Sequence, residues 1–287
     1  MTNIIQYLKD KFTLSEVNEV QVKNGVHVYE VLKEGKKYYL KYFEKKSDAK
    51  EILCYQALLR TEIPIIKFYE TTENSILLED MTINHEYRIG CEDDFRNPKA
   101  IKSVAKWFKQ LHALSYDKTV NFDFLSEDDV EFKQDEITLC YEQYGNDDFF
   151  NLLLSVRIQF NDYLKKSDKI LSHGDFYYKN FFVNRTDNEV VMFDFNYMKK
   201  GLLSEELSLI RRNLRNRSKE SEEVFIKEYG DYDEVEYEIY SIYRHVSCLL
   251  GALSIENFPN WAVESKELLD AGILSRNLIS TKSKINS

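Results

Sequence analysis

The chain has 287 residues, enough for one large domain or for two lobes, and it carries a formal net charge of −10 at pH 7. That acidic balance argues against nucleic-acid binding, because phosphate backbones require a basic face. No apolar stretch approaches the roughly 20 residues that a membrane span needs, so we expect no membrane partner. The four cysteines form no C-x-x-C pair, which argues against a cysteine-ligated metal. Because the N-terminus is charged and lacks the apolar core of a signal peptide, we expect a cytoplasmic protein.

The first part of the chain predicts a short amphipathic helix followed by an antiparallel meander. The helix is expected at residues 3–12. Strands rich in Val and Tyr are expected at 17–23, 26–32 and 38–43. An Asn24-Gly25 pair and a segment around Gly35 separate these strands, as in tight hairpin turns.

One helix and two more strands complete this part. Ser47-Asp48 is expected to cap a helix that runs to about Arg60. Two further strands are expected at 65–70 and 75–79, on either side of a Thr-Thr-Glu-Asn turn. The predicted order is therefore three strands, a helix and two strands.

From about Thr82 onward the pattern is mainly helical. Helices are expected at 98–114, at 149–165 and from about 204 to the end. A short hairpin, with strands at 181–183 and 190–193, interrupts them. We predict an α+β fold of two lobes. Residues 1–81 form a small antiparallel β lobe with one main helix, and residues 82–287 form a larger, mainly helical lobe.

The most informative polar residues flank this hairpin. The run H-G-D-F-Y-Y-K-N places Asp175 and Asn180 in the loop before the first strand, and Asp194 follows the second. A short hairpin brings its two ends together, so we expect all three side chains to converge. Phosphoryl transfer needs such a set. One carboxylate accepts the proton of the attacking hydroxyl, while a second carboxylate and an amide hold the Mg²⁺ that neutralises the nucleotide phosphates.

The H-G-D-x-x-x-x-N run and the following D-F pair resemble the catalytic loop and the metal-binding aspartate of the aminoglycoside phosphotransferase and choline kinase family, which has the protein-kinase fold. The resemblance implies that Asp175 is the catalytic base and that Asn180 and Asp194 are Mg²⁺ ligands. It also implies ATP or GTP as the phosphate donor, bound by the first lobe. His173 is expected to organise the loop, because Asp175 fills the catalytic role.

The first lobe offers a matching lysine. Lys41 lies among apolar residues in the third strand, and the kinase-like arrangement pairs such a lysine with a glutamate while the lysine holds the α- and β-phosphates. We expect Glu51, early in the following helix, to be the partner. Glu44 lies past the strand and Glu62 lies at the far end of the helix, so both are less well placed.

The nucleotide-binding segments match the family unevenly. The stretch that ends at Glu79, Asp80 and Met81 resembles the hinge, where the backbone of Glu79 and Met81 would hydrogen-bond the adenine edge. The phosphate-covering loop departs from the pattern, because only Gly25 stands where the family often has several glycines. Where the family often has an Asp-Leu pair, this chain has Glu206-Leu207.

These features predict a small-molecule kinase that transfers the γ-phosphate of ATP or GTP to a hydroxyl. Two acidic tracts, at 123–136 and 231–238, are either solvated helix faces or an acidic rim that attracts a cation. The second interpretation favours a cationic acceptor such as an aminoglycoside, choline or another amino alcohol. The alternative is a non-catalytic, kinase-like assembly protein of the spore-coat-associated type, because the run after Glu206-Leu207 is rich in arginine as in those relatives. A metal-dependent phosphoesterase would need more histidine ligands than five scattered histidines supply. The acceptor and the oligomeric state stay open.

Overall fold

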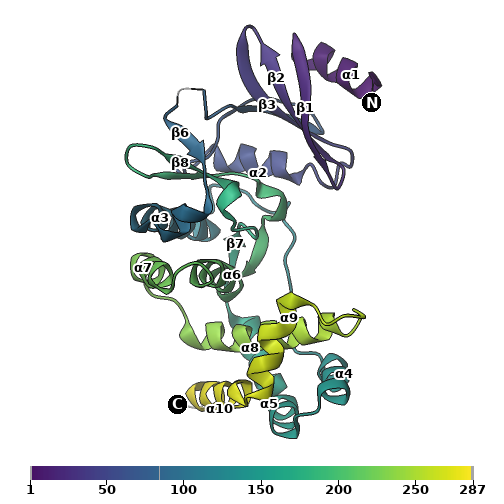
Figure 1. The fold of residues 1–287 in the computed structure, drawn as a ribbon, viewed down its shortest axis with the longest axis vertical. Helices are drawn as coiled ribbons and strands as arrows, with labels where there is room; N and C mark the ends of the chain where they lie inside the picture. Colours follow the sequence, from purple (N-terminus) through teal and green to yellow (C-terminus); the bar gives the residue numbers. More distant parts are fainter. Residues whose placement is uncertain (1, 84, 286–287) are drawn as a thin grey trace. The chain divides into compact units, whose positions relative to one another are not determined.

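A helix and a five-stranded antiparallel sheet begin the fold in the computed structural model, which describes residues 2–83 and 85–285 (Figure 1). The elements are α1 (Thr2–Phe12), β1 (Glu16–Lys23), β2 (Val26–Lys33), β3 (Lys36–Phe43), α2 (Lys50–Leu58), β4 (Phe68–Thr71) and β5 (Ser75–Glu79). The strand order is β1-β2-β3-β5-β4. The predicted meander, helix and two strands are all present.

Tight turns set the register of the first three strands. Asn24 and Gly25 both have positive φ, at 52° and 79°, and so do Glu34 and Gly35, at 50° and 73°. Two successive residues of this kind form the hairpin turn that suits the twist of a sheet. One face of the sheet then packs on α1. The buried residues of this cluster are Leu8, Phe12, Leu14, Tyr29, Val31, Leu40 and Leu77.

Helix α2 begins later than the sequence predicts. It starts at Lys50, and its N-cap residue is Ala49, which makes no capping side-chain bond. The Ser47 hydroxyl instead donates to the Asp48 carboxylate, at 3.1 Å. The predicted Ser47-Asp48 cap is therefore wrong, because these two side chains bond each other in the loop before the helix.

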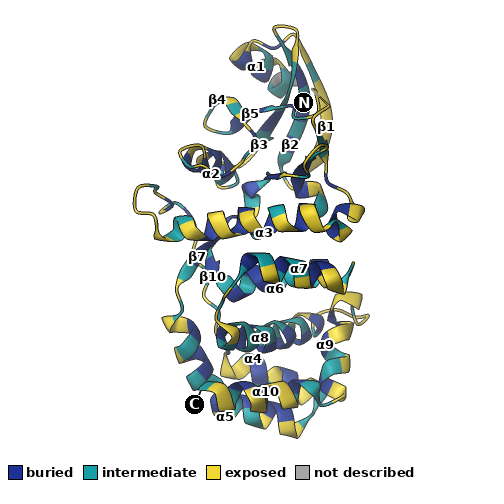
Figure 2. Ribbon diagram, turned by 90° about the vertical axis from the view of Figure 1, so that its left-hand side faces the viewer, coloured by how far each residue is buried: buried dark blue, intermediate teal, exposed yellow. Residues whose placement is uncertain are grey.

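A second sheet and the helix α3 follow. The elements are β6 (Tyr87–Ile89), a 3₁₀ turn at Glu92–Arg96, α3 (Pro98–Ala113) and the strands β8 (Phe181–Asn184) and β9 (Val190–Met192) in the order β6-β8-β9. Buried and exposed residues alternate along α3, as Figure 2 shows, because its apolar side chains recur at helical spacing. The Ser103 hydroxyl of α3 accepts a hydrogen bond from the Val190 amide, at 2.9 Å, and thereby ties the helix to the hairpin.

The chain forms two compact units, and the first contains the elements described so far. It comprises Met1–Ser126, Leu171–Lys200 and Leu209–Gly230, and the second comprises Glu127–Ile170, Gly201–Ser208 and Asp231–Ser287. The chain passes from one to the other within β7 (Lys169–Ser172), β10 (Lys199–Leu202) and α6 (Leu203–Arg215). Helix α7 (Lys219–Tyr229) belongs to the first unit. The division predicted near residue 81 stays a prediction.

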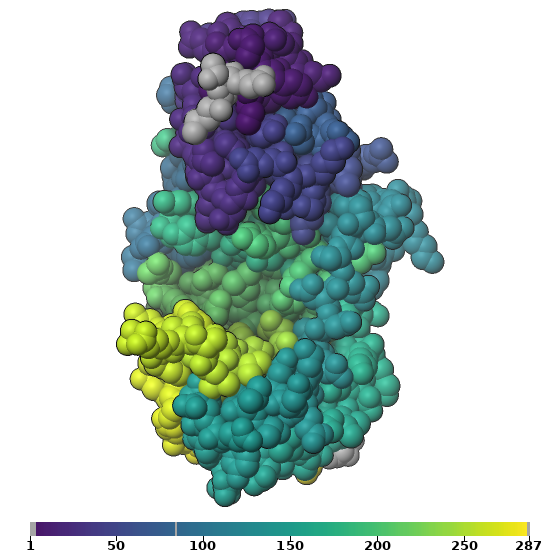
Figure 3. Space-filling view, turned by 90° about the vertical axis from the view of Figure 1, so that its right-hand side faces the viewer, coloured from purple at the N-terminus to yellow at the C-terminus, as the bar shows by residue number. Residues whose placement is uncertain are grey.

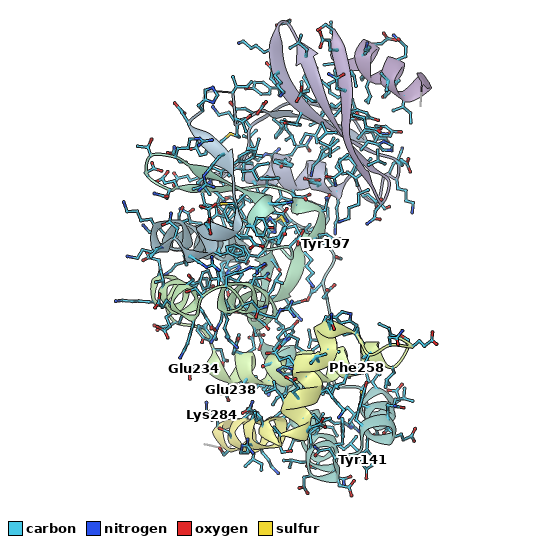
Figure 4. The ribbon with its side chains drawn as sticks, in the orientation of Figure 1. Tyr141, Tyr197, Glu234, Glu238, Phe258 and Lys284 are labelled. Carbon is cyan, nitrogen blue, oxygen red and sulfur yellow. The ribbon has the colours of Figure 1, made fainter. Side chains whose placement is uncertain are left out.

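The second unit is built from helices around an apolar core. They are α4 (Gln134–Tyr144), α5 (Asp147–Lys166), α8 (Glu234–Ala252), α9 (Asn260–Asp270) and α10 (Ile273–Ile285). Figure 3 shows the yellow C-terminal segment directly beside the blue-green segment of α4 and α5, in agreement with the packing of α10 on α5. On its surface Lys284 of α10 pairs with Glu238 of α8, at 2.5 Å (Figure 4). No helix among the described residues is long and apolar enough to cross a membrane.

Candidate functional site

A buried histidine organises the loop between β7 and the hairpin. The Asp175 amide donates to His173 Nδ1 at 3.3 Å, so the proton of the ring lies on Nε2, which donates to the Phe193 carbonyl at 3.1 Å. Burial lowers the pKa of His173, which keeps the ring neutral and suits this arrangement. Gly174 has a φ of 77°, and a Cβ there would lie 2.6 Å from the Tyr197 carbonyl oxygen. The loop therefore requires glycine at this position.

Asp175 and Asn180 contact each other directly. The Asn180 side-chain amide donates to the Asp175 carboxylate at 2.8 Å and to its carbonyl oxygen at 3.0 Å. The Asn180 carbonyl accepts from the Phe193 amide, at 3.0 Å, so Asp194 follows at the same end of the hairpin. The amide nitrogen of Asn180 is thus committed to Asp175, and Oδ1 is the side-chain atom suited to a metal ion.

Asp194 is held in an unusual backbone conformation. Its φ of 67° and ψ of 70° lie in the left-handed region, where few residues other than glycine occur. Asp194 Oδ1 accepts from Lys41 Nζ at 2.8 Å and from the side-chain amide of Asn196 at 2.6 Å. The Phe195 amide donates to Glu51 Oε1, at 3.3 Å. These contacts fix the direction in which the carboxylate points.

Lys41 links the sheet to α2 and to the hairpin. Its ammonium lies 2.8 and 3.1 Å from the two carboxylate oxygens of Glu51 and 2.8 Å from Asp194. Burial opposes the charge of Lys41, but Glu51 and Asp194 together outweigh it and raise the pKa of Lys41. Burial acts against the Asp194 charge as well, and the proximity of Lys41 overcomes it and lowers the pKa of Asp194. The lysine and Asp194 are therefore both ionised at neutral pH.

The predicted partner of Lys41 is the one that the structure pairs with it. Glu51 is fully buried against Lys41. Glu44 instead accepts from His27 Nε2, at 2.9 Å, on the other side of its strand. The sequence thus identifies the correct glutamate among three.

A pocket of about 310 Å³ lies beside the segment that resembles the hinge. Glu79, Asp80 and Met81 line it, together with Pro64, Ile65 and Val191 among others. Asp80 is buried, and its carboxylate accepts from the amide and the hydroxyl of Thr82, at 2.9 and 2.6 Å. Asp80 thereby fixes the backbone turn on which Met81 lies.

Two residues that support the loop were not predicted from the sequence. The Asn213 side chain of α6 donates to the Phe176 carbonyl at 2.7 Å, and it anchors the segment just after Asp175. Asn196 contacts Asp194 as described above, two residues along the chain. No local pattern marks Asn213. The proximity of Asn196 to Asp194 is the one clue that sequence offers for it.

The arginine-rich run and a buried histidine, His112, both have structural roles. Arg211 and Arg215 of α6 both bond Glu222, at 2.8 and 2.6 Å, so these two arginines of the arginine-rich run pair with a nearby glutamate. Burial lowers the pKa of His112 to about 3, and its Nδ1 lies 2.7 Å from the Tyr229 hydroxyl. Tyr197, which lies beside the loop, is 60% exposed (Figure 4).

Metal ligands in this site must come from few protein groups. Among residues 2–83 and 85–285, no cluster of three or more His, Cys, Asp or Glu side chains is placed to hold a metal ion. Asp194 and Asn180 supply one carboxylate and one amide oxygen. Mg²⁺ accepts such a set, since it often binds one or two carboxylates and completes its shell with water and phosphate oxygens. The donor set therefore fits Mg²⁺ bound together with a nucleotide.

Comparison with known proteins agrees with this geometry. Residues 20–242 match the model of the phosphotransferase enzyme family. Choline kinase LicA from Streptococcus pneumoniae has a similar structure, with a TM-score of 0.58 and 14% identity over 97% of this chain and 99% of that one. An ethanolamine kinase from Plasmodium vivax is similar with a TM-score of 0.59 and 18% identity, over 94% of this chain and 88% of that one. ADP-bound aminoglycoside phosphotransferase APH(2'')-Ib is similar with a TM-score of 0.61 and 15% identity, over 93% of this chain and 96% of that one. No curated protein matches the sequence. The predicted α+β, kinase-like fold is confirmed.

Proposed function

We propose, since the chain belongs to the phosphotransferase enzyme family, that it transfers the γ-phosphate of ATP or GTP to a hydroxyl group of a small molecule. The observation that carries this proposal is the linked set of Lys41, Glu51 and Asp194, with Asp175 and Asn180 at the same end of the hairpin. A buried lysine bound to two carboxylates is costly to maintain for stability alone. A nucleotide whose phosphates bind Lys41 would account for this buried charge.

Each residue of the set has a distinct proposed role. Asp175 orients the acceptor hydroxyl and takes its proton, and the Asn180 amide holds the Asp175 carboxylate in position. Asp194 and Asn180 Oδ1 would hold Mg²⁺, which when bound neutralises charge on the phosphates. Lys41 binds the α- and β-phosphates, and Glu51 orients Lys41.

We assign the pocket beside Glu79 and Met81 to the nucleotide base. Its volume of about 310 Å³ is that of a small ligand site, and Asp80 fixes the turn whose backbone would bond the base edge. We assign Gly25, in the turn between β1 and β2, to the phosphates. This assignment leaves the choice between ATP and GTP to experiment.

We propose that the acceptor is a cationic alcohol and that the protein acts in the cytoplasm. The net charge of −10 supports it, and the similar structures include kinases named for choline, ethanolamine and aminoglycosides. Some carboxylates of the acidic tracts form hydrogen bonds within the second unit. Asp233 caps α8 by accepting from the Val235 amide at 2.9 Å, and Glu236 accepts from the Ser204 amide at 3.0 Å. The remaining carboxylates are the candidates for binding a cation.

The test is transfer of labelled γ-phosphate from Mg-ATP and Mg-GTP to aminoglycosides, choline, ethanolamine and related amino alcohols. We expect transfer to one class of acceptor, with the rate reduced about 10²–10⁴-fold in Asp175→Asn. Transfer that is undiminished in Asp175→Asn would contradict the assigned role of this residue. Absence of Mg-nucleotide binding by the wild-type protein would contradict the proposed function and favour the non-catalytic assembly protein.

A further inference from the structure

The pairing of the first three strands places Lys23 on the same face of the sheet as Lys41. Lys23 pairs with Val26, Val28 pairs with Lys41, and residues two apart in a strand point to the same side. A bulge at Val20 produces this register, because Glu19 pairs with Tyr29 but Gln21 pairs with Val28. Without the extra residue, the side chain of Lys23 would project from the opposite face.

Lys23 differs from three other lysines of the sheet in having no carboxylate partner. Lys33, Lys37 and Lys41 pair with Glu70, Glu30 and Glu51 respectively. Among the residues that the structure describes, no ion pair involves Lys23, and its side chain is exposed. An ammonium group without a partner, on the face that carries the phosphate-binding lysine, is available to an anion.

The turn next to Lys23 is fixed from the other face of the sheet. His27 points to that face and its Nε2 donates to the Glu44 carboxylate at 2.9 Å, while the Glu44 backbone amide donates to the Gly25 carbonyl at 2.9 Å. A Cβ on Gly25 would lie 3.2 Å from the Glu44 carboxylate. The single-glycine turn therefore has a negative charge behind it, which weakens its backbone amides as a phosphate site.

The shared face links Lys23 to the candidate phosphate site. Lys41 lies on the same face as Lys23 and bonds Asp194 at 2.8 Å. The bound phosphates of a nucleotide would occupy the region that these two charges share.

We propose that Lys23 is a second phosphate-binding lysine, which contacts the β- and γ-phosphates and replaces the backbone grip that a loop with several glycines would give. This proposal rests on the proposed function, because it needs a nucleotide at Lys41. It assigns binding, not proton transfer, to Lys23. The chain thereby compensates for its short turn with a side chain.

The experiment measures binding of a magnesium complex of a non-hydrolysable ATP analogue, and of AMP, by calorimetry. Lys36 is the matched control, because it is an exposed lysine next to the equivalent turn at Glu34-Gly35. We expect Lys23→Ala to weaken the analogue roughly tenfold, as the loss of one charge-assisted contact, and to leave AMP within about twofold. Lys36→Ala should change neither ligand, and Lys23→Arg should restore most of the affinity.

The outcomes separate this proposal from the proposed function. If the wild-type protein binds the analogue and Lys23→Ala binds it as Lys36→Ala does, the role of Lys23 is wrong and the proposed function stands. Equal weakening of AMP and the analogue would also overturn it, since the effect would then not depend on the outer phosphates. If the wild-type protein binds no nucleotide, both proposals fail.

Discussion

The two units differ in what they bury. The first unit encloses the charged group Lys41, Glu51 and Asp194, of which Glu51 is completely buried. The core of the second unit is a large apolar cluster that includes Leu153 and Phe160. Buried charges stabilise a fold poorly, whereas buried apolar side chains account for most of its stability. The first unit therefore maintains a charged site beside its own apolar core, at a cost in stability, whereas the cluster described in the second unit is apolar.

The largest effect is expected at the buried pair of Lys41 and Glu51, where stability and nucleotide binding should respond differently to substitution. Lys41→Met leaves two carboxylates without their counter-charge and should lower the free energy of unfolding by about 3–5 kcal/mol. The double variant Lys41→Met/Glu51→Leu should regain most of that stability, because an apolar pair replaces an ionic one. Mg-nucleotide binding should stay impaired in both. Urea unfolding and calorimetry would check this, and a double variant as unstable as the single one would contradict the comparison.

The next effect concerns the core of the second unit. Leu153 is fully buried in α5, and Leu153→Ala should lower the free energy of unfolding by about 2–5 kcal/mol, through lost contacts and a cavity. Nucleotide affinity of the folded variant should stay within about twofold, since every nucleotide ligand that we assign lies in the first unit. A folded Leu153→Ala protein with strongly reduced nucleotide affinity would show that the units are not separable in this way.

A smaller effect should appear on acidification. The pKa of His112 is about 3 in the fold and about 6.5 in the unfolded chain. Above pH 6.5 the ring is neutral in both states, so the burial of His112 costs no stability through protonation. As the pH falls from 6.5 toward 3, the unfolded chain binds a proton that the native state excludes. Between pH 7 and pH 4.5 this should remove roughly 2–3 kcal/mol. Urea midpoints of wild type and His112→Gln would test it, and an equally steep pH dependence in the variant would exclude His112 as the cause.

The smallest effect is expected at the surface of the second unit. Glu238 and Lys284 form an ion pair in which both side chains are partly exposed to water (Figure 4). Glu238→Gln should leave the thermal midpoint unchanged within error, because such pairs are screened and entropically costly. A clear drop in Tm would mean that this contact between α8 and α10 matters more than its exposure indicates.

Local sequence patterns were sufficient for the strands, for most helices and for the Asp175, Asn180 and Asp194 set. Each depends on short-range features, such as an Asn-Gly turn, helical periodicity or a loop joined to a short hairpin. The pairing of Lys41 with Glu51 was also predicted, although only the resemblance to a family singled out the glutamate. The roles of these residues stay predictions until they are tested.

Features that depend on long-range contacts could not be predicted. The bulge at Val20 that turns Lys23 toward the Lys41 face has no sequence marker, and neither has the bond from Asn213 to the Phe176 carbonyl in the loop after Asp175. The start of α2 was misplaced because Ser47 bonds Asp48 in place of the helix backbone. The acceptor site remains without a motif, since helical segments that differ only in side chains can form many different pockets.

Asp175 and Asp194, at the same end of the hairpin, are assigned different tasks, and Mg²⁺-dependent nucleotide binding tests this assignment most directly. We would measure the affinity for a non-hydrolysable ATP analogue, with and without Mg²⁺, in wild type, Asp175→Asn and Asp194→Asn. We expect Asp175→Asn to bind the analogue as wild type does, whereas Asp194→Asn should lose about tenfold or more in affinity and no longer respond to Mg²⁺. Equal affinity and equal Mg²⁺ response in all three proteins would contradict it.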